Sequence, residues 1–276
     1  MTPSAQEIRL EVLIATYGTE GLKRLCNPRQ LEKTPAVRYL ISVQSDSDRP
    51  VEIPTELSER EDISVCFCSG KGLSRNRNHL LENATAPYLL LADDDIEYRG
   101  ESLKKIIHVL DENPTIDIAT FQIKTGDRRR YPEKERDIVY RPFKSGFYPC
   151  SVEIALRRES VILHGLRFDT RFGLNGDDFC CGEEDVFLFE AFKRGLKARF
   201  FPIDILEHPH PTSDGVRKPS ELYIVSKGAV IQKLYGKWAG LRRLKMAFKL
   251  PGGILHNMRL LKKGALKLTA LQSSSR

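Results

Sequence analysis

Three consecutive aspartates, Asp93, Asp94 and Asp95, follow the apolar run of residues 89–92. Burying an unpaired carboxylate costs several kcal/mol, so we expect these side chains where a buried strand ends and meets water or a cation. Asp93 and Asp95 would then point the same way, and their oxygens suit a hard divalent ion that keeps a substrate phosphate among its ligands. The alternative is that the cluster only caps a strand or begins a helix.

A second acidic cluster, Glu183, Glu184 and Asp185, precedes an apolar segment that reaches to Gly195. Helix amide dipoles favour carboxylates in the first turn, so the pattern predicts a helix that begins here and ends at the glycine. Capping alone would explain these residues. The preceding residues 173–182 are rich in glycine and aspartate, which lets backbone and ligand approach closely. A carboxylate in such a place can accept a proton from a hydroxyl group.

Two histidines, His208 and His210, mark a third polar segment at residues 207–213. Imidazole can ligate a metal or bind phosphate, whereas a single histidine in a turn more often has a structural role. Both interpretations stay open from the residues alone.

The size and the cysteine content of the chain restrict its class. It has 276 residues, of which 41% are hydrophobic, enough for one large α/β core or for one domain with a smaller appendage. The six cysteines include no CxxC pair, and the first residues lack the layout of a secretory signal, so we expect reduced thiols and a cytoplasmic location. No apolar stretch approaches the roughly 18–20 residues that cross a bilayer, so no membrane span is predicted.

The net charge of +7 is unevenly distributed along the chain. Residues 222–276 contain 12 Lys and Arg and no Asp or Glu, while the preceding part carries 32 basic and 37 acidic residues, a balance of −5. A mildly acidic body therefore carries a basic tail.

Short apolar runs alternate with amphipathic segments along the first half of the chain. Strands are predicted at residues 12–15, 39–43, 63–67 and 88–91, and a helix is predicted at residues 20–25. This alternation is the βαβ pattern of a parallel sheet. Open α/β sheets bind ligands at the carboxyl ends of their strands, which is where the three aspartates fall.

Two further segments follow the acidic strand. A helix that ends at residues 113–114 is predicted from the helical spacing of four apolar residues, Leu103, Ile106, Ile107 and Leu110. Residues 125–148 are polar, basic and rich in turn formers, which predicts a long loop. That loop would be either a lid or acceptor loop, or a solvated surface segment.

The ordered set of these segments resembles the glycosyltransferase family 2 enzymes of the GT-A type fold. The resemblance spans residues 11 to about 233 and rests on short segments in a fixed order, namely residues 12–17, 72–78, 91–95, 165–173, 182–185 and 193–195. It implies an α/β fold of GT-A type at residues 8–233, in which helices flank a Rossmann-like mixed sheet. Residues 234–276 would form a basic amphipathic helical extension.

The resemblance also implies a reaction. This is an inverting transfer of a sugar from a nucleoside-diphosphate donor, most of all a UDP-sugar, to a hydroxyl of a glycan or lipid-linked acceptor in surface polysaccharide biosynthesis. Asp93 and Asp95 would hold Mn²⁺ or Mg²⁺ against the donor diphosphate. Asp185 corresponds to the catalytic base of the family, and Glu184 would orient it or contact the acceptor. His208, slightly favoured over His210, would complete the metal or diphosphate site.

A nucleotide pocket is implied as well. Its expected residues lie at the pocket edge, on the supporting helix or at the acidic strand end: Thr16, Tyr17, Arg77, Asn78, Asp93 and Asp94. Family members commonly carry an acidic pair after the second strand, whereas this chain has residues 42–48 there, with Asp46 as the candidate. This departure leaves the base and the sugar of the donor open.

The tail carries two apolar faces with helical spacing. The first comprises Trp238, Leu241, Leu244 and Phe248, beside Arg242, Arg243, Lys245 and Lys249; the second comprises Ile254, Met258, Leu261, Ala265 and Leu268. Such helices suit an anionic bilayer surface, where each Lys or Arg contributes about 1 kcal/mol. The alternative is that they pack on the catalytic domain or on a second subunit. We expect peripheral contact with the inner face of the cell membrane, because a lipid-linked acceptor would be presented there; no motif supports nucleic-acid binding.

Two other functions are considered. A sugar-phosphate nucleotidyltransferase would share the sheet and the acidic metal ligands, but it should carry a glycine-rich, basic phosphate loop after the first strand, and residues 16–20 are not one. A non-catalytic scaffold of GT-A shape would hold partners at the membrane through its tail. The presence of both acidic clusters argues against the scaffold.

Overall fold

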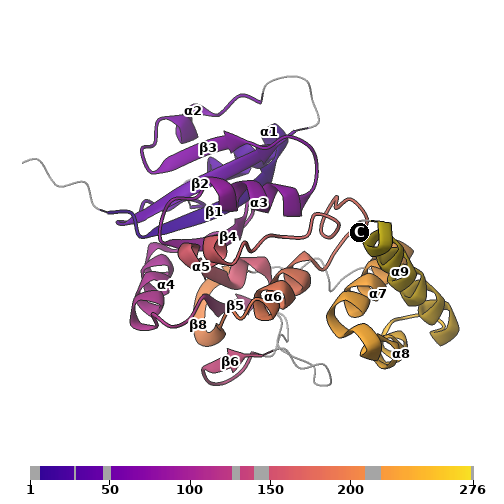
Figure 1. Cartoon of the computed structure of the whole chain (residues 1–276). Helices are drawn as coiled ribbons and strands as arrows, with labels where there is room; N and C mark the ends of the chain where they lie inside the picture. Colours follow the sequence, from indigo (N-terminus) through magenta and orange to yellow (C-terminus); the bar gives the residue numbers. More distant parts are fainter. Residues whose placement is uncertain are drawn as a thin grey trace, which may run out of the picture.

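The protein is described by a computed structural model that covers residues 7–27, 29–45, 51–125, 131–139, 149–208 and 219–274. Within these ranges, eight strands form one sheet in the order β3-β2-β1-β4-β7-β5-β8-β6 (Figure 1). The strands are β1 (Leu10–Tyr17), β2 (Val37–Gln44), β3 (Ile63–Phe67), β4 (Tyr88–Asp93), β5 (Ile118–Thr125), β6 (Arg136–Ile138), β7 (Ile154–Arg157) and β8 (Ala198–His208). This mixed sheet with flanking helices confirms the predicted fold class.

The first four strands of the chain form a parallel half-sheet. β1 pairs in parallel with β2 and β4, and β2 pairs in parallel with β3, so their carboxyl ends lie at one edge. Ala15 of β1 is the register partner of Asp93 of β4, which brings Thr16 next to the three aspartates. β7 runs antiparallel to both β4 and β5 and makes the sheet mixed.

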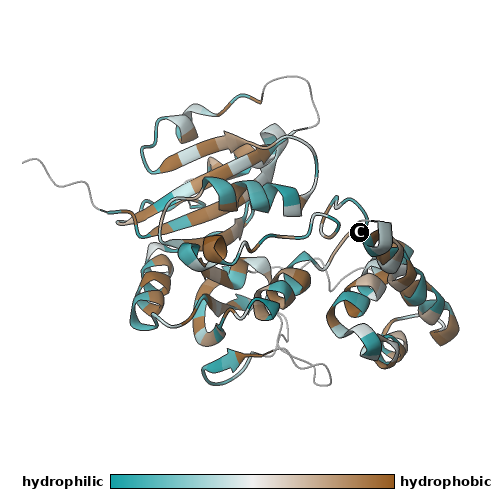
Figure 2. Ribbon diagram, viewed as in Figure 1, coloured by the Kyte–Doolittle hydropathy of each residue, from teal (hydrophilic) through white to brown (hydrophobic). Residues whose placement is uncertain are grey.

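Helices cover both faces of the sheet, and the alternation of side chains along β1 shows how. Val12 and Ile14 belong to the core on the face of α1 (Gly18–Leu25) and α4 (Gly100–Glu112). Leu13 points the other way, into the core on the face of α3 (Leu73–Asn83) and α6 (Glu183–Lys193). Figure 2 shows hydrophobic residues along the strands and polar residues on the outer helix surfaces. Each fully buried leucine contributes about 1.5–3 kcal/mol.

Most predicted elements lie inside the observed ones. The four predicted strands fall within β1 to β4, and the predicted helix through Leu110 lies within α4, whose C-cap is Asn113. Two short helices, α2 (Thr55–Ser58) and α5 (Arg158–Leu163), are not predicted. The 3₁₀ turn η1 (Ser151–Glu153) precedes β7.

The segment predicted as a long loop, residues 125–148, contains a strand. β6 pairs antiparallel with β8 at the edge of the sheet, and Asp137 forms an ion pair of 2.8 Å with Arg199. Arg136 and Asp137 are exposed, so the strand lacks the alternation of buried and polar residues that would reveal it in sequence. Residues 126–130 and 140–148 lie outside the described part of the chain.

The last described residues form a separate group of helices beside the sheet (Figure 1). These are α7 (Glu221–Tyr235), α8 (Ala239–Lys249) and α9 (Ile254–Ser274), with the 3₁₀ turn η3 (Gly236–Trp238) between the first two. The domain boundary expected between residues 233 and 234 falls inside α7, and the division remains a prediction. None of the helices in the described residues is long and apolar enough to cross a membrane.

Two glycines allow α7 and α9 to pack with their backbones in contact. A Cβ atom on Gly228 would lie 2.1 Å from the carbonyl oxygen of Leu261, and one on Gly264 would lie 1.8 Å from that of Val225. Leu261, together with Leu268, is fully buried by this packing. The second apolar face of the tail therefore packs against α7, as the packing alternative for the tail predicts.

Candidate active site

Asp94, the middle residue of the acidic strand end, is held by protein contacts. Thr16 Oγ1 donates a hydrogen bond of 2.5 Å to Asp94 Oδ2, and Arg24 donates to both carboxylate oxygens at 3.2 and 2.8 Å. A Cβ on Gly21 would lie 1.9 Å from Thr16 Oγ1, so a glycine is needed where α1 passes this pair. The side chains of Thr16 and Asp94 thus join the ends of β1 and β4.

Arg77 of α3 links the two acidic clusters, although they lie about 90 residues apart in the sequence. Its Nη2 donates to Asp93 Oδ1 at 3.0 Å and to Ser151 Oγ at 2.7 Å, and its Nη1 donates to Glu183 Oε1 at 3.3 Å. Glu184 Oε1 lies 3.5 Å from the same Nη1. Arg77 is only 1% exposed. We call Arg77, Asp93, Glu183 and Glu184 the acidic centre.

Burial and charge compete in the acidic centre. Burial opposes the charge of Arg77, but Asp93, Glu184 and Glu183 outweigh it, so the pKa of Arg77 is raised. Desolvation raises the pKa of Asp93 against the opposing effect of Arg77. Desolvation, and then repulsion by Glu184, raise the pKa of Glu183 to about 7. One guanidinium therefore holds together three carboxylates that would otherwise repel one another.

The residues expected to bind a metal are only partly described. Asp93 keeps 38% of its side chain exposed and Asp95 is exposed, so both reach the surface at the strand end. β8 ends at His208, whose side chain lies outside the described residues, as do His210 and Asp46. Among the described residues, no three His, Cys, Asp or Glu side chains form a group that could hold a metal ion. The metal site remains a prediction.

Asp185 lies where α6 meets α7 and α8. It lies in the first turn of α6, and its Oδ2 is 3.6 Å from Nζ of Lys227 in α7. The N-cap, Gly182, has φ of +90°, and a Cβ there would lie 2.3 Å from Val230 Cγ2. This glycine lets α6 begin directly against α7. Asp185 and Glu184 thus lie in one helical turn but face different surroundings.

Two further predicted residues are Tyr17, at the edge of the sheet, and Asn78, on α3. Tyr17, at the end of β1, is 44% exposed. Asn78 instead binds protein backbone, because its side chain donates to the oxygen of Phe168 at 2.9 Å and accepts from its nitrogen at 2.8 Å. Phe168 in turn lies under the guanidinium of Arg77, 5.5 Å from ring centroid to Cζ. Asn78 therefore supports the acidic centre from behind.

Several residues of the site are not predicted from the sequence. Asn76 donates to the carbonyl oxygens of Thr16 and Ser42 at 3.1 and 3.0 Å, which ties together the ends of β1 and β2. Asn76 belongs to the recognised segment of residues 72–78, and Glu183 to the second acidic cluster, so the sequence carries a signal for both. Lys227 carries no such signal, since only the packing of α7 on α6 brings it to Asp185.

Solved structures of low sequence identity share the fold. The crystal structure of S. aureus TarS residues 1–349 aligns with a TM-score of 0.60 and 13% identity, over 95% of this chain and 91% of that one. The same protein with UDP-GlcNAc aligns with a TM-score of 0.55 and 14% identity, over 92% and 70%. The mannosyltransferase PcManGT from Pyrobaculum calidifontis, in complex with GDP-Man and Mn²⁺, aligns with a TM-score of 0.50 and 14% identity, over 94% and 69%.

The sequence comparisons give the family. No curated protein sequence matches the chain. The family model for glycosyl transferase family 2 matches residues 19–194, more than half of the chain, and this segment runs from α1 to the end of α6. It includes the acidic centre and Asp185. The chain belongs to glycosyl transferase family 2.

Proposed function

We propose that this protein is an inverting glycosyltransferase that moves a sugar from a nucleoside-diphosphate sugar, in the first place a UDP-sugar, to a hydroxyl of a glycan or lipid-linked acceptor. The observation that carries the proposal is the acidic centre, because Arg77 joins the acidic end of β4 to the first turn of α6. A donor bound at Asp93 and an acceptor bound at Asp185 would then meet at one place. Surface polysaccharide biosynthesis is the proposed setting.

The donor would lie along the edge formed by β1, β2 and β4. Thr16, Tyr17 and Asp94 lie there, with Arg77 and Asn78 on the supporting side, and Asp46 would be the contact for the base or ribose. The named ligands of the similar structures, UDP-GlcNAc in TarS and GDP-Man in PcManGT, support a nucleotide-sugar donor and leave two bases to test.

Asp93 and Asp95 fit a Mn²⁺ or Mg²⁺ ion as far as their donor chemistry goes. Two carboxylates are a sufficient protein contribution for such an ion, because substrate phosphates and water can complete its shell. Arg77 holds Asp93 Oδ1 at 3.0 Å and so orients its carboxylate. The ion, when bound, would stabilise the charge of the departing diphosphate, and His208 is the proposed additional ligand.

Asp185 is the proposed catalytic base. Its carboxylate would take the proton of the acceptor hydroxyl as that oxygen forms a bond to the anomeric carbon, from the face opposite to the donor diphosphate. The bond from that carbon to the diphosphate oxygen would break, and the nucleoside diphosphate would leave with the electron pair. Glu184, held near Arg77, would contact the acceptor or orient Asp185.

Peripheral membrane contact is proposed for α8. Its apolar face is exposed, with Trp238 at 41%, Leu241 at 62%, Leu244 at 43% and Phe248 at 64%. Figure 2 shows α8 at the outer end of the molecule, on the side of α9 and away from the sheet. An apolar face beside basic residues supports binding to an anionic lipid surface. A lipid-linked acceptor would reach the enzyme from that surface.

The test of the proposed function is a thermal-shift screen of UDP, GDP and their sugar conjugates, with and without Mn²⁺. Donor binding at 100-fold excess over the dissociation constant stabilises by about 3 kcal/mol. We expect a Mn²⁺-dependent rise in Tm with one nucleotide, abolished in Asp95→Ala and kept in the surface control Asp137→Ala. If a folded sample shows no shift with any nucleotide, the transferase proposal is wrong.

A further inference from the structure

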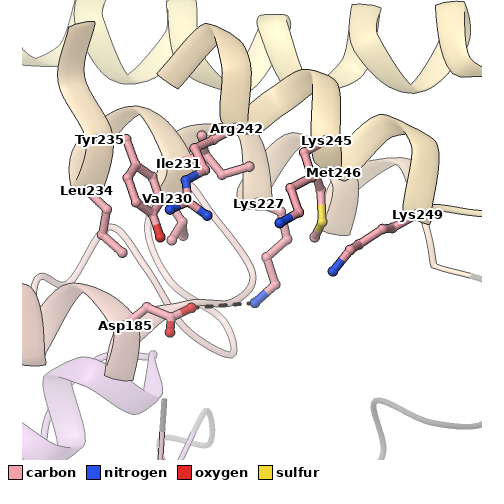
Figure 3. Close-up of a pocket in the computed structure, with 10 residues that line it drawn as sticks. All are labelled: Asp185, Lys227, Val230, Ile231, Leu234, Tyr235, Arg242, Lys245, Met246 and Lys249. Carbon is pink, nitrogen blue, oxygen red and sulfur yellow. Dashed lines mark ion pairs between the residues drawn. The ribbon is translucent and has the colours of Figure 1, made fainter. Parts of the chain in front are cut away.

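A pocket of about 320 Å³ lies on the side of Asp185 that faces the tail helices (Figure 3). Its walls come from α6, α7 and α8. Among the described residues of its lining, Lys227, Arg242, Lys245 and Lys249 are cationic and Asp185 alone is acidic. We call this the basic pocket.

The charges of the basic pocket are poorly balanced by protein groups. Lys227 lies 3.6 Å from Asp185, and Arg242 stacks on the ring of Tyr235 at 4.6 Å. Lys245 and Lys249 have no ion-pair or hydrogen-bond partner within the described residues. In Figure 3 the ammonium groups of Lys227, Lys245 and Lys249 point into the same open space beside Asp185. Neighbouring like charges raise the local potential and attract an anion.

Apolar side chains also line the basic pocket. Val230, Ile231 and Leu234 come from α7, and Met246 comes from α8. An apolar wall lowers the local dielectric constant, so an anion there is attracted more strongly than at an open surface. These apolar side chains also suit the carbon-rich part of a ligand that carries the anion.

The pocket is fixed relative to α6 by contacts around it. Lys233 of α7 forms ion pairs with Asp169 at 3.3 Å and with Glu190 of α6 at 3.1 Å. Gly182 packs directly on Val230, as described above. An anion in the pocket would therefore lie at a defined place next to Asp185.

We propose that the basic pocket binds a phosphate group of the acceptor, beside the hydroxyl that Asp185 deprotonates. The proposal rests on the proposed function, because it makes the pocket the acceptor side of that reaction. A phosphate offers several strong acceptor oxygens at once, which matches several ammonium groups converging from two helices. A neutral sugar acceptor would leave Lys245 and Lys249 without a counter-charge among the described residues. The acceptor class is thus a phosphate-bearing alcohol, free or attached to a lipid.

The test uses glycerol 3-phosphate as the probe and glycerol as its uncharged match. Binding is followed by saturation-transfer NMR of the full chain, with saturating Mg²⁺, which is diamagnetic, and the nucleotide that the thermal-shift screen selects, so that the donor site is filled. We expect saturation transfer to glycerol 3-phosphate and none to glycerol. The double variant Lys245→Gln/Lys249→Gln should weaken the apparent affinity about tenfold, roughly threefold for each lysine.

The matched control is Lys262→Gln/Lys263→Gln, which removes the same charge from exposed positions of α9. We expect this control to bind glycerol 3-phosphate as the wild type does. Equal binding of glycerol and glycerol 3-phosphate would overturn the proposal, and so would equal weakening in both double variants. If Lys245→Gln/Lys249→Gln fails to fold, the two single variants give the same test at about threefold each.

Two more measurements complete the test. The first distinguishes a lipid phosphate from a small phosphate ligand, and the second distinguishes failure of this inference from failure of the proposed function. In the first, binding to phosphatidylglycerol vesicles is compared with binding to phosphatidylcholine vesicles. If Lys245→Gln/Lys249→Gln loses vesicle binding but keeps full affinity for glycerol 3-phosphate, the cations serve the lipid surface and the proposal is wrong. In the second, the nucleotide-induced shift in Tm is measured in every variant. A retained nucleotide shift without phosphate discrimination defeats this inference alone, whereas loss of the shift in the wild type defeats the proposed function.

Discussion

The acidic centre and the basic pocket meet different residues of the first turn of α6, and they differ in how their charged side chains are paired. In the acidic centre, a buried Arg77 has Asp93, Glu183 and Glu184 within 3.5 Å. In the basic pocket, Lys245 and Lys249 are exposed and have no partner within the described residues. In the first region one buried guanidinium already holds all three carboxylates. In the second region Lys245 and Lys249 would gain a counter-charge from a bound molecule.

The largest expected effect comes from the residue that separates the two regions. Asp185→Asn removes the proposed base but keeps its size, so we expect nucleotide release from the donor sugar to slow by about 10²–10⁴-fold. The nucleotide-induced shift in Tm should stay unchanged. The control is Asp177→Asn, at a surface ion pair. Wild-type rates in Asp185→Asn would show that another group is the base.

Arg77→Met tests whether the acidic centre is held by its guanidinium. The variant leaves buried carboxylates without a counter-charge, so we expect a loss of about 3–5 kcal/mol in the free energy of unfolding. Urea unfolding at neutral pH measures it. Arg75→Met on the same helix removes an exposed ion pair of 3.4 Å with Asp177 and an exposed hydrogen bond of 3.2 Å to the oxygen of Lys71, and should cost under about 1 kcal/mol. Equal losses in the two variants would contradict the account.

The raised pKa of Glu183 should make the free energy of unfolding depend on pH. Its folded pKa of about 7 lies above the ordinary value of 4.5, so the folded protein binds this proton more tightly than the unfolded chain does. The stabilisation is therefore complete below pH 4.5 and is lost as the pH rises through 7. Relative to Glu183→Gln, the wild type should lose about 2 kcal/mol between pH 5 and pH 7.5. A constant difference between the two proteins would show that Glu183 does not titrate in this range.

The packing of α9 on α7 holds the frame of the basic pocket. Gly264→Ala places a Cβ where it would lie 1.8 Å from the carbonyl oxygen of Val225, so the helices must separate. We expect a loss of about 2 kcal/mol in the free energy of unfolding, measured by urea unfolding. In Gly240→Ala on α8 the added Cβ meets nothing within 4 Å, and stability should stay the same or rise slightly. If Gly264→Ala leaves the free energy of unfolding unchanged, the contact between α7 and α9 is loose.

The smallest expected effect concerns the outer face of α8. Leu241→Glu/Phe248→Glu should weaken binding to phosphatidylglycerol vesicles about tenfold, because two exposed apolar side chains leave the lipid contact. Ile162→Glu/Leu163→Glu on α5, where the two side chains are 56% and 76% exposed, is the control for an equal change elsewhere. Vesicle sedimentation measures both. Equal binding of all three proteins would mean that α8 meets a protein surface instead.

The sequence predicts most of the catalytic fold because its signals are local. The apolar runs of β1 to β4 and the helical spacing in α4 depend on neighbouring residues, and the structure bears them out. β6 escapes prediction because its exposed edge residues carry no alternating pattern. The close crossing of α7 and α9 depends on two glycines far apart in sequence, which no periodicity reveals.

The sequence proposes the main residues of the candidate site but not the contacts between them. Asp93, Asp185 and Arg77 come from recognisable segments, so the sequence proposes them. That Arg77 would join two clusters, and that Asp185 would face Lys227, depends on tertiary packing between α3, α6 and α7. The tail shows the limit most clearly, because its two predicted apolar faces look alike in sequence, yet Leu261, Ala265 and Leu268 of one face are buried while the four residues of the other face are exposed.

The most direct measurement is a crystal structure of the protein with Mn²⁺ and the nucleotide that the thermal-shift screen selects, with anomalous data at the manganese edge. The account predicts an anomalous peak within ligand distance of Asp93 and Asp95, against the nucleotide diphosphate. The basic pocket should contain no nucleotide. A nucleotide bound away from the carboxyl ends of β1 and β4, or a manganese peak remote from both aspartates, would contradict the account.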